Sequence, residues 1–261
     1  MTRICFLNPF GTYQFDDLVL ETLRPYLRDG TTVESVHLDN CPRNIDYYLP
    51  KHLVETEVFK AVLAAEEDGF DAFVIGCCYD PGLTVAREIT SMPVIGPLEA
   101  SIGNVRPFGQ RFSVVTDHRK AVPELEDLVR KYGAWPNCRS VRAIDWYVDD
   151  MVKDPAAVAR DAAERCAAVM EEDDAEAIVL GCTIIAACYE KAQLEDLADI
   201  PPLPIVNPNV MAVKQAEMLA DLAKVGQYRI SRKGYYQQHT QHDPEEARDV
   251  LDNYLRSRAE A

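Results

Sequence analysis

Two stretches of this chain, FVIGCCYDPG at residues 73–82 and IVLGCTIIAA at residues 178–187, are short apolar runs that end in Gly-Cys. A short continuous apolar run followed by a break is typical of a strand buried on both faces of a parallel sheet. Cys77 and Cys182 would therefore each stand at the carboxyl end of a buried strand. The recurrence of the pattern in the two halves of the chain indicates an internal duplication.

The rest of the chain alternates between short apolar runs, rich in β-branched residues, and longer amphipathic stretches. We predict strands at residues 3–7, 32–38, 72–76, 94–95, 112–116, 139–144, 177–181 and 204–206. We predict helices at residues 16–28, 53–67, 81–90, 122–132, 155–171, 184–194 and 209–222. Because short apolar strands joined through helices form parallel sheets covered on both faces, the pattern predicts an α/β protein.

The duplication extends beyond the two Gly-Cys runs. RICFLNPFGT at 3–12 and RFSVVTDHRK at 111–120 both place a polar loop after a strand, and MPVIGPLEAS at 92–101 matches LPIVNPNVMA at 203–212. We therefore predict two pseudo-symmetric Rossmann-like lobes, each an open parallel sheet with helices on both faces. The expected boundaries are 1–97 with 208–230 for the first lobe, 98–207 for the second, and 231–261 for a C-terminal tail with an amphipathic helix.

The duplicated sheets also predict where a ligand binds. Open parallel sheets bind ligands outside the carboxyl ends of their strands, and two facing lobes would bring both such edges to one cleft. We expect the active site in that cleft. If a pseudo-twofold axis relates the lobes, Cys77 and Cys182 approach one ligand from opposite sides.

Composition narrows the classes of partner. The chain of 261 residues carries 43 acidic and 27 basic side chains, a net charge of −16, so its surface would repel nucleic acid and anionic lipids. No apolar run reaches the roughly 20 residues that cross a bilayer, so we expect no membrane partner. Eight cysteines in mostly apolar surroundings, with no recognisable leader, predict a reduced cytoplasmic protein.

The motifs of common cofactors are missing from the sequence. No Gly-x-Gly-x-x-Gly turn follows the first strand, and no phosphate-binding loop ending in Lys-Ser or Lys-Thr occurs. HTQH at 239–242 has metal-like spacing but no third ligand. We therefore expect neither a cofactor nor a metal.

Two opposed thiols suit one kind of chemistry, the removal of a proton from one face of a carbon acid and its return on the other. A thiolate is favoured at a helix N-terminus, and Asp80-Pro81 after Cys77 has the pattern of a helix start. A cysteine at the end of a core strand is usually only a small buried hydrophobe. Here, however, both cysteines directly follow Gly, whose missing side chain would let a ligand approach the backbone.

These motifs resemble the Asp/Glu/hydantoin racemase superfamily, and most of all its hydantoin and allantoin racemase branch. The resemblance covers nearly the whole chain. It is carried by Asn8, Pro9 and Thr12, GCCYDPGLTVARE at 76–88, PVIGPLEAS at 93–101, RFSVVT at 111–116, VLGC at 179–182 and SRKG at 231–234. It implies a cofactor-independent racemase in which Cys77 and Cys182 each serve one enantiomer of a 5-substituted hydantoin or similar cyclic ureide.

The same resemblance implies the partners and the substrate-binding residues. The partners are a small-molecule substrate and further copies of the chain in a homo-oligomer. Asn8 would bind the polar edge of the ring. The ring carbonyls would be held by Thr116 and by the backbone at Cys78, Tyr79, Thr183 and Ile184. The set of binding residues is completed by Pro9, Thr12, Asp80 and Pro208.

The chain departs from the branch beside both cysteines. Cys78-Tyr79 stands where a pair such as Phe-Gly is expected, and Thr183-Ile184-Ile185 stands where Ala-Gly-Met is expected. Gly-Cys-Thr is closer to the amino-acid racemase and arylmalonate decarboxylase branches. One alternative is therefore a racemase of an acyclic amino acid or small dicarboxylate, and a second is a non-catalytic two-lobed binding protein.

A polar and aromatic segment with Tyr47, Tyr48, Pro50 and His52 is predicted as a loop after the second strand. Such a loop either closes over a substrate or only decorates the surface.

Overall fold

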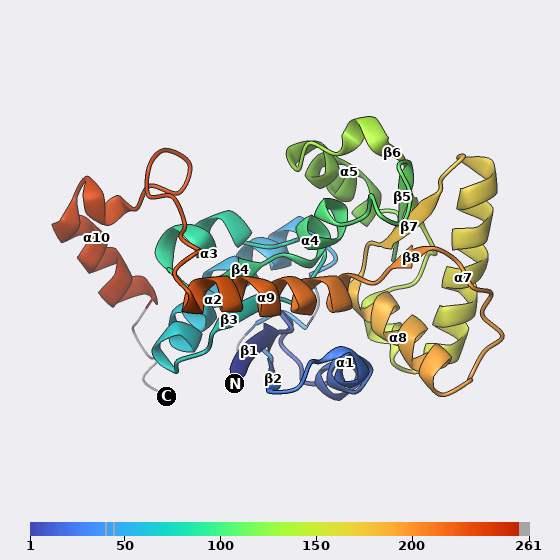
Figure 1. The fold of residues 1–261 in the computed structure, drawn as a ribbon, viewed down its shortest axis with the longest axis horizontal. Coiled ribbons are helices and arrows are strands. Elements are labelled where there is room, and N and C mark those ends of the chain that lie inside the picture. The colour runs from blue at the N-terminus through green and yellow to red at the C-terminus, as the bar shows by residue number, and fades with distance from the viewer. Residues whose placement is uncertain (40, 44, 256–261) are drawn as a thin grey trace.

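The computed structural model describes residues 1–39, 41–43 and 45–255, and its chain forms two four-stranded parallel sheets (Figure 1). The first sheet has the order β2-β1-β3-β4, with β1 (Thr2–Leu7), β2 (Thr31–Val36), β3 (Ala72–Ile75) and β4 (Val94–Ile95). The second has the order β6-β5-β7-β8, with β5 (Phe112–Thr116), β6 (Cys138–Ala143), β7 (Ala177–Leu180) and β8 (Ile205–Val206). The two sheets share one topology, so the predicted duplicated α/β fold is confirmed.

Helices surround both sheets. They are α1 (Asp16–Leu23), α2 (Tyr48–Glu67), α3 (Leu83–Ile89), α4 (Pro97–Gly103), α5 (Ala121–Lys131), α6 (Val148–Met151), α7 (Pro155–Glu172), α8 (Thr183–Leu194), α9 (Pro208–Lys224) and α10 (Pro244–Val250). Single 3₁₀ turns lie at Arg24–Tyr26, Trp135–Asn137 and His239–Gln241, and a π-helical turn at Leu251–Leu255. Along the described chain, no helix combines the length and apolar character that a membrane span needs.

The central strands are fully buried, as their continuous apolar sequences predict. Every residue of β3 and of β7 is buried, and each of these strands pairs in parallel with a central neighbour, β1 or β5. All eight predicted strands are present, with ends within two residues of the prediction. Burial on both faces is what allows the continuous apolar pattern to identify them.

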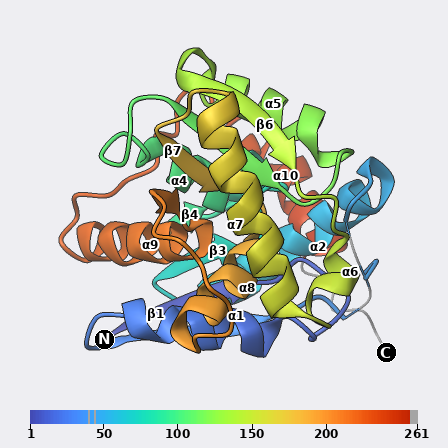
Figure 2. The same ribbon diagram turned by 90° about the vertical axis from the view of Figure 1, so that its right-hand side faces the viewer.

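The two halves of the chain are joined by helices that pack across them. Helix α9 lies against β1, β3 and β4, as expected for a helix that returns to the first lobe. Helix α8 packs on α7 and also on α1 of the first half, and Figure 2 shows α7 running across the second sheet. The lobe boundaries given above stay a prediction.

The region of α3 and α4 differs from the sequence-based expectation. Helix α3 begins at Leu83 rather than at residue 81, and its N-cap is Gly82, with φ of 71° and no side-chain cap. The expectation that Asp80 caps this helix was wrong, because the Asp80 carboxylate instead accepts the N–H groups of Leu98 and Glu99 at the start of α4. Helix α4 was missed because its capping group is far away in the sequence.

The segment with Tyr48, Pro50 and His52 is not a loop. Helix α2 starts at Tyr48, five residues before the predicted start, and its first turn carries these side chains. Helix α6 was also missed, since its four residues are too few for a periodic pattern.

The C-terminal tail carries the predicted helix, α10, with the buried Ala247 on its inner face. The tail is anchored to α3 by the Arg232 guanidinium, which donates to the carbonyl oxygens of Arg87, Glu88 and Thr90. A cation at the carboxyl end of a helix satisfies unpaired carbonyls and interacts favourably with the helix dipole.

The glycines before the two cysteines serve packing rather than ligand access, contrary to the expectation from the sequence. A Cβ atom on Gly76 would lie 2.5 Å from the carbonyl oxygen of Leu7 and 2.4 Å from the ring of Phe6. A Cβ atom on Gly181 would lie 2.6 Å from Val114. Both positions therefore need Gly because the neighbouring central strand approaches so closely.

We predict that Gly76→Ala lowers the free energy of unfolding by about 2 kcal/mol or more, because the Leu7 carbonyl belongs to a strand and cannot move aside. Gly103→Ala is the matched control, since a Cβ atom there meets nothing within 4 Å. Urea denaturation of both variants measures the difference. Equal stability of the two variants would contradict the packing argument.

Candidate active site

The two Gly-Cys loops lie against each other, although they belong to different halves of the chain. The Thr183 hydroxyl, next to Cys182, donates to the carbonyl oxygen of Gly76 at 2.9 Å. The Cys78 thiol points toward the carbonyl oxygen of Leu180 at 3.8 Å, the last residue of β7. The carboxyl ends of β3 and β7 therefore meet at one place, as the duplicated fold requires.

A small buried cavity lies where these loops meet. Its volume is about 10 Å³, room for roughly one water molecule. It is lined by Phe10, Ile45, Asp46, Cys77, Cys78, Tyr79, Asp117, Val148, Gly181, Cys182 and Thr183. Both cysteines proposed as bases are thus in one cavity, with exposed fractions of 6% for Cys77 and 7% for Cys182.

Of the residues predicted to bind substrate, Cys78, Tyr79 and Thr183 line this cavity and the others do not. Asn8 is buried and donates to the Asp16 carboxylate at 2.5 Å and to the Ser35 hydroxyl at 3.0 Å. Pro9, next to Asn8, is buried, and Thr12 is partly exposed. These first-loop residues support the cavity wall at Phe10 rather than forming part of the lining.

The remaining predicted residues hold the loops in place. The Thr116 hydroxyl lies 3.2 Å from the carbonyl oxygen of Gly181, and the backbone N–H of Ile184 points to the Cys182 sulfur. Pro208 is the first residue of α9, whose next side chain, Asn209, donates to the carbonyl oxygen of Thr183 at 2.8 Å.

Asp80 shapes the loop that carries Cys77. Its backbone N–H donates to the carbonyl oxygen of Cys77 at 3.0 Å, and its φ of 44° is uncommon outside Gly. Its buried carboxylate accepts three hydrogen bonds, from the Tyr132 hydroxyl at 2.7 Å and from two N–H groups of α4. Burial raises the pKa of Asp80 to about 7.

Sequence reasoning missed two carboxylates of the cavity, Asp117 and Asp46. Asp117 directly follows β5, as Asn8 directly follows β1, so the internal repeat already contained a signal for it. Asp46 lies in the segment between β2 and α2 and carries no such signal, because only the tertiary fold brings it to the cavity.

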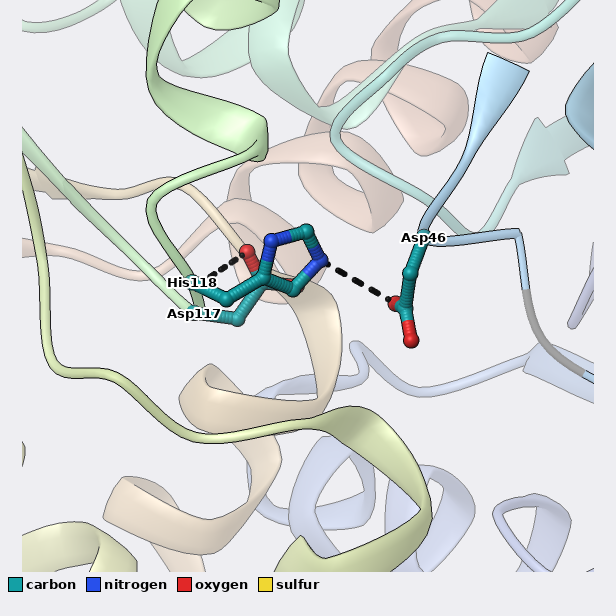
Figure 3. A group of neighbouring side chains, drawn as sticks. All are labelled: Asp46, Asp117 and His118. Carbon is teal, nitrogen blue, oxygen red and sulfur yellow. Dashed lines mark hydrogen bonds and ion pairs between the residues drawn. The ribbon is translucent and has the colours of Figure 1, made fainter.

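His118 lies near both of these carboxylates, and Figure 3 shows its ring turned toward Asp46. Its Nε2 atom is 3.3 Å from Asp46 and 4.0 Å from Asp117. Burial alone lowers the pKa of His118, but the two carboxylates outweigh it and leave the pKa above its ordinary value. The three side chains are close enough to hold a metal ion.

Further contacts join the two halves near the cavity. Lys51 of α2 forms an ion pair with Glu124 of α5, and the Tyr47 and Tyr147 hydroxyls are hydrogen-bonded. The Tyr147 ring stacks on His118 with 5.1 Å between centroids. At about 10 Å³ the cavity is smaller than any organic ring.

Burial dominates the acidity of both thiols and raises the pKa of each well above its ordinary value. For Cys77, the N–H of Tyr79 and the cation of Lys51 oppose this rise. For Cys182, the Asp117 carboxylate adds to the rise, while the N–H groups of Ile184 and Ile185 oppose it. The α8 N-terminus thus assists Cys182 as expected, but the thiolate predicted from helix starts is not the dominant form here.

We predict that the alkylation of Cys182 by iodoacetamide is slow at pH 7 and accelerates as pH rises, because only the thiolate reacts. Asp117→Asn removes a negative charge that raises the thiol pKa, so the acceleration shifts to lower pH. Peptide mass spectrometry measures the rates, with Asp145→Asn as a control outside the cavity. A shift of the Asp117→Asn profile to higher pH would contradict this electrostatic account.

The fold and the cavity define a two-lobed α/β protein in which both halves contribute buried thiols to a shared site, Cys77 and Cys78 from the first half and Cys182 from the second. The family model described as Asp/Glu/Hydantoin racemase matches residues 4–216. A hydantoin racemase of Pseudomonas sp. (strain NS671) is 33% identical over 222 residues, covering 85% of this chain and 87% of that protein. A hydantoin racemase of Rhizobium meliloti is 33% identical over 217 residues, covering 83% and 88%.

The structural comparison agrees. The allantoin racemase from Klebsiella pneumoniae has a TM-score of 0.81 at 27% identity, covering 91% of this chain and 94% of that one. The chain belongs to the Asp/Glu/hydantoin racemase family, and it is an isomerase of the racemase class. The resemblance inferred from the Gly-Cys motifs is confirmed.

Proposed function

We propose that the protein racemises a 5-substituted hydantoin or a similar cyclic ureide, such as allantoin, by two-base proton transfer between Cys77 and Cys182. The observation that carries this proposal is the presence of both thiols, from equivalent positions of the two halves, in one cavity. A carbon next to a carbonyl loses its proton to one sulfur and receives a proton from the other. The reaction then needs no further acid, base or cofactor.

The high thiol pKa fits this chemistry. A thiolate in an apolar cavity is scarce at neutral pH, but it is a stronger base than one in water, which suits a weak carbon acid. Negative charge that develops on the ring oxygen requires donors that are already in place. The backbone N–H groups at the start of α8, next to Cys182, are suitably located for that role.

The charge of the cavity supports a neutral ring over a dicarboxylic amino acid. Within the described residues the lining includes two carboxylates, Asp46 and Asp117, and no Lys or Arg. A second substrate carboxylate would meet like charge, which is costly in a buried site. A cyclic ureide instead offers N–H donors that carboxylates accept. The similarity to hydantoin and allantoin racemases points the same way.

A non-catalytic binding protein is a weaker alternative. It would leave the matched thiols without a role, and the family model that the chain matches describes racemases. We also propose that the protein is a cytoplasmic homo-oligomer. Light scattering of the purified protein tests the oligomeric state.

We predict that Cys77→Ser and Cys182→Ser each lower racemisation at least about a hundredfold, since positioned acid–base groups contribute 10²- to 10⁴-fold. Cys78→Ser is the matched control, because serine can still donate to the Leu180 carbonyl, and it should retain activity within about tenfold. Polarimetry with the active substrate measures all three. Full activity in either catalytic variant would refute the two-thiol mechanism.

We predict that a set of candidate substrates distinguishes racemisation of a cyclic ureide from racemisation of an acyclic amino acid. In D₂O, proton NMR should show enzyme-dependent loss of the ring C–H signal for L-5-substituted hydantoins or allantoin, and none for the α-proton of L-aspartate or L-glutamate. Buffer-only samples correct for the slow spontaneous exchange of hydantoins. Exchange of the amino acids with the rings untouched would move the assignment to the acyclic alternative.

A further inference from the structure

A second, larger cavity lies away from the two cysteines and is lined by residues of α3, α4, α5 and the tail. Its volume is about 480 Å³, within the range of small-molecule sites. It shares no lining residue with the cavity of the two cysteines. Its aromatic and apolar walls include Ile102, Phe112, Tyr132, Tyr235 and Tyr236.

The charge of this cavity is opposite to that of the protein as a whole. Its lining contains three cations, Arg87, Arg106 and Lys131, and one carboxylate, Glu99. Arg87 is paired with Glu99 at 2.9 Å, which leaves two cations in excess. In the described part of the chain no carboxylate pairs with Arg106 or Lys131, and the Lys131 ammonium reaches only the Thr84 hydroxyl, at 3.4 Å.

Two uncompensated cations at one cavity are notable in a chain with net charge −16. Other cations of the described chain lie beside carboxylates, as with Arg28 and Asp221 or Arg142 and Asp173. A carboxylate or similar anion would satisfy both cations, and its apolar body would lie against the tyrosine and phenylalanine rings.

One residue of this cavity also contacts the loop of Cys77. The Tyr132 ring lines the cavity, and its hydroxyl donates to the buried Asp80 carboxylate at 2.7 Å. Asp80 in turn holds the turn that begins at Cys77, with its N–H bonded to the Cys77 carbonyl oxygen. A ligand that moves the Tyr132 ring therefore acts on the position of the Cys77 loop.

We propose that this cavity binds a small organic anion with a flat or branched apolar body, and that its occupancy changes the reactivity of Cys77 through Tyr132 and Asp80. The anion is held by Arg106 and Lys131. Because the hydroxyl of Tyr132 moves away from Asp80 when the ring shifts, the Cys77 loop loosens and the thiol becomes more accessible.

Binding is tested by isothermal titration calorimetry of the full chain with benzoate, and with benzamide as a neutral probe of the same shape. Benzoate should bind at one site per chain, at least about tenfold more tightly than benzamide. Charge reversal of Arg106→Glu with Lys131→Glu should weaken benzoate binding at least about tenfold, about 1.4 kcal/mol. Arg139→Glu with Lys153→Glu, outside the cavity, is the matched control and should have no effect.

A steric variant keeps the test independent of charge. Gly103→Leu adds a side chain at the cavity lining, where a Cβ atom meets nothing within 4 Å, so it narrows the cavity and should weaken benzoate binding at least about tenfold. Circular dichroism confirms that each variant is folded. Absence of saturable binding to the wild type, equal binding of benzamide, or unchanged binding to a folded Gly103→Leu variant would overturn the proposal.

The coupling is tested without any assumption about the substrate. In a Cys182→Ser background, saturating benzoate should raise the rate of Cys77 alkylation by iodoacetamide at least about twofold, followed at the peptide level. Tyr132→Phe should still bind benzoate but lose this acceleration, because the hydrogen bond to Asp80 is absent. An unchanged or slower rate in the presence of bound benzoate would overturn the link to Cys77.

Discussion

The structure depends on the contact between two equivalent turns from the two halves of the chain. The Thr183 hydroxyl reaches the carbonyl of Gly76, and the Cys78 thiol faces that of Leu180, so each Gly-Cys turn is bonded to the end of the other half's strand. This contact fixes two thiols in one cavity. It also explains the glycines, since the turns must pass close to the central strands β1 and β5.

Burial of the site makes the thiols stronger bases but restricts the space for a substrate. Excluding water raises the pKa of both thiols, so each is a strong base once deprotonated. The same closure leaves a cavity of about 10 Å³, too small for a substrate ring. A ring-sized substrate therefore needs a wider cavity than the one this structure has.

The sequence predicted the strands well and indicated that Cys77 and Cys182 share one cavity, because buried parallel strands leave continuous apolar runs and a duplication repeats them. It failed where the deciding contact is distant along the chain. Asp80 caps α4 across 18 residues rather than the adjacent α3, so the start of α3 was misplaced and α4 was missed. Asp46 and His118 come together only through tertiary folding. Asp117 could have been predicted, since it directly follows β5 as Asn8 directly follows β1.

The most direct test of the central claim is to follow deuterium during the first turnovers of one pure enantiomer of 5-benzylhydantoin or allantoin in D₂O. Chiral chromatography with mass spectrometry measures the label in the product and in the remaining substrate. If Cys77 and Cys182 act from opposite faces, the early product carries one deuterium, while the remaining substrate keeps its proton. Early product that retains the original proton would show that a single base serves both faces, and would contradict the two-thiol account.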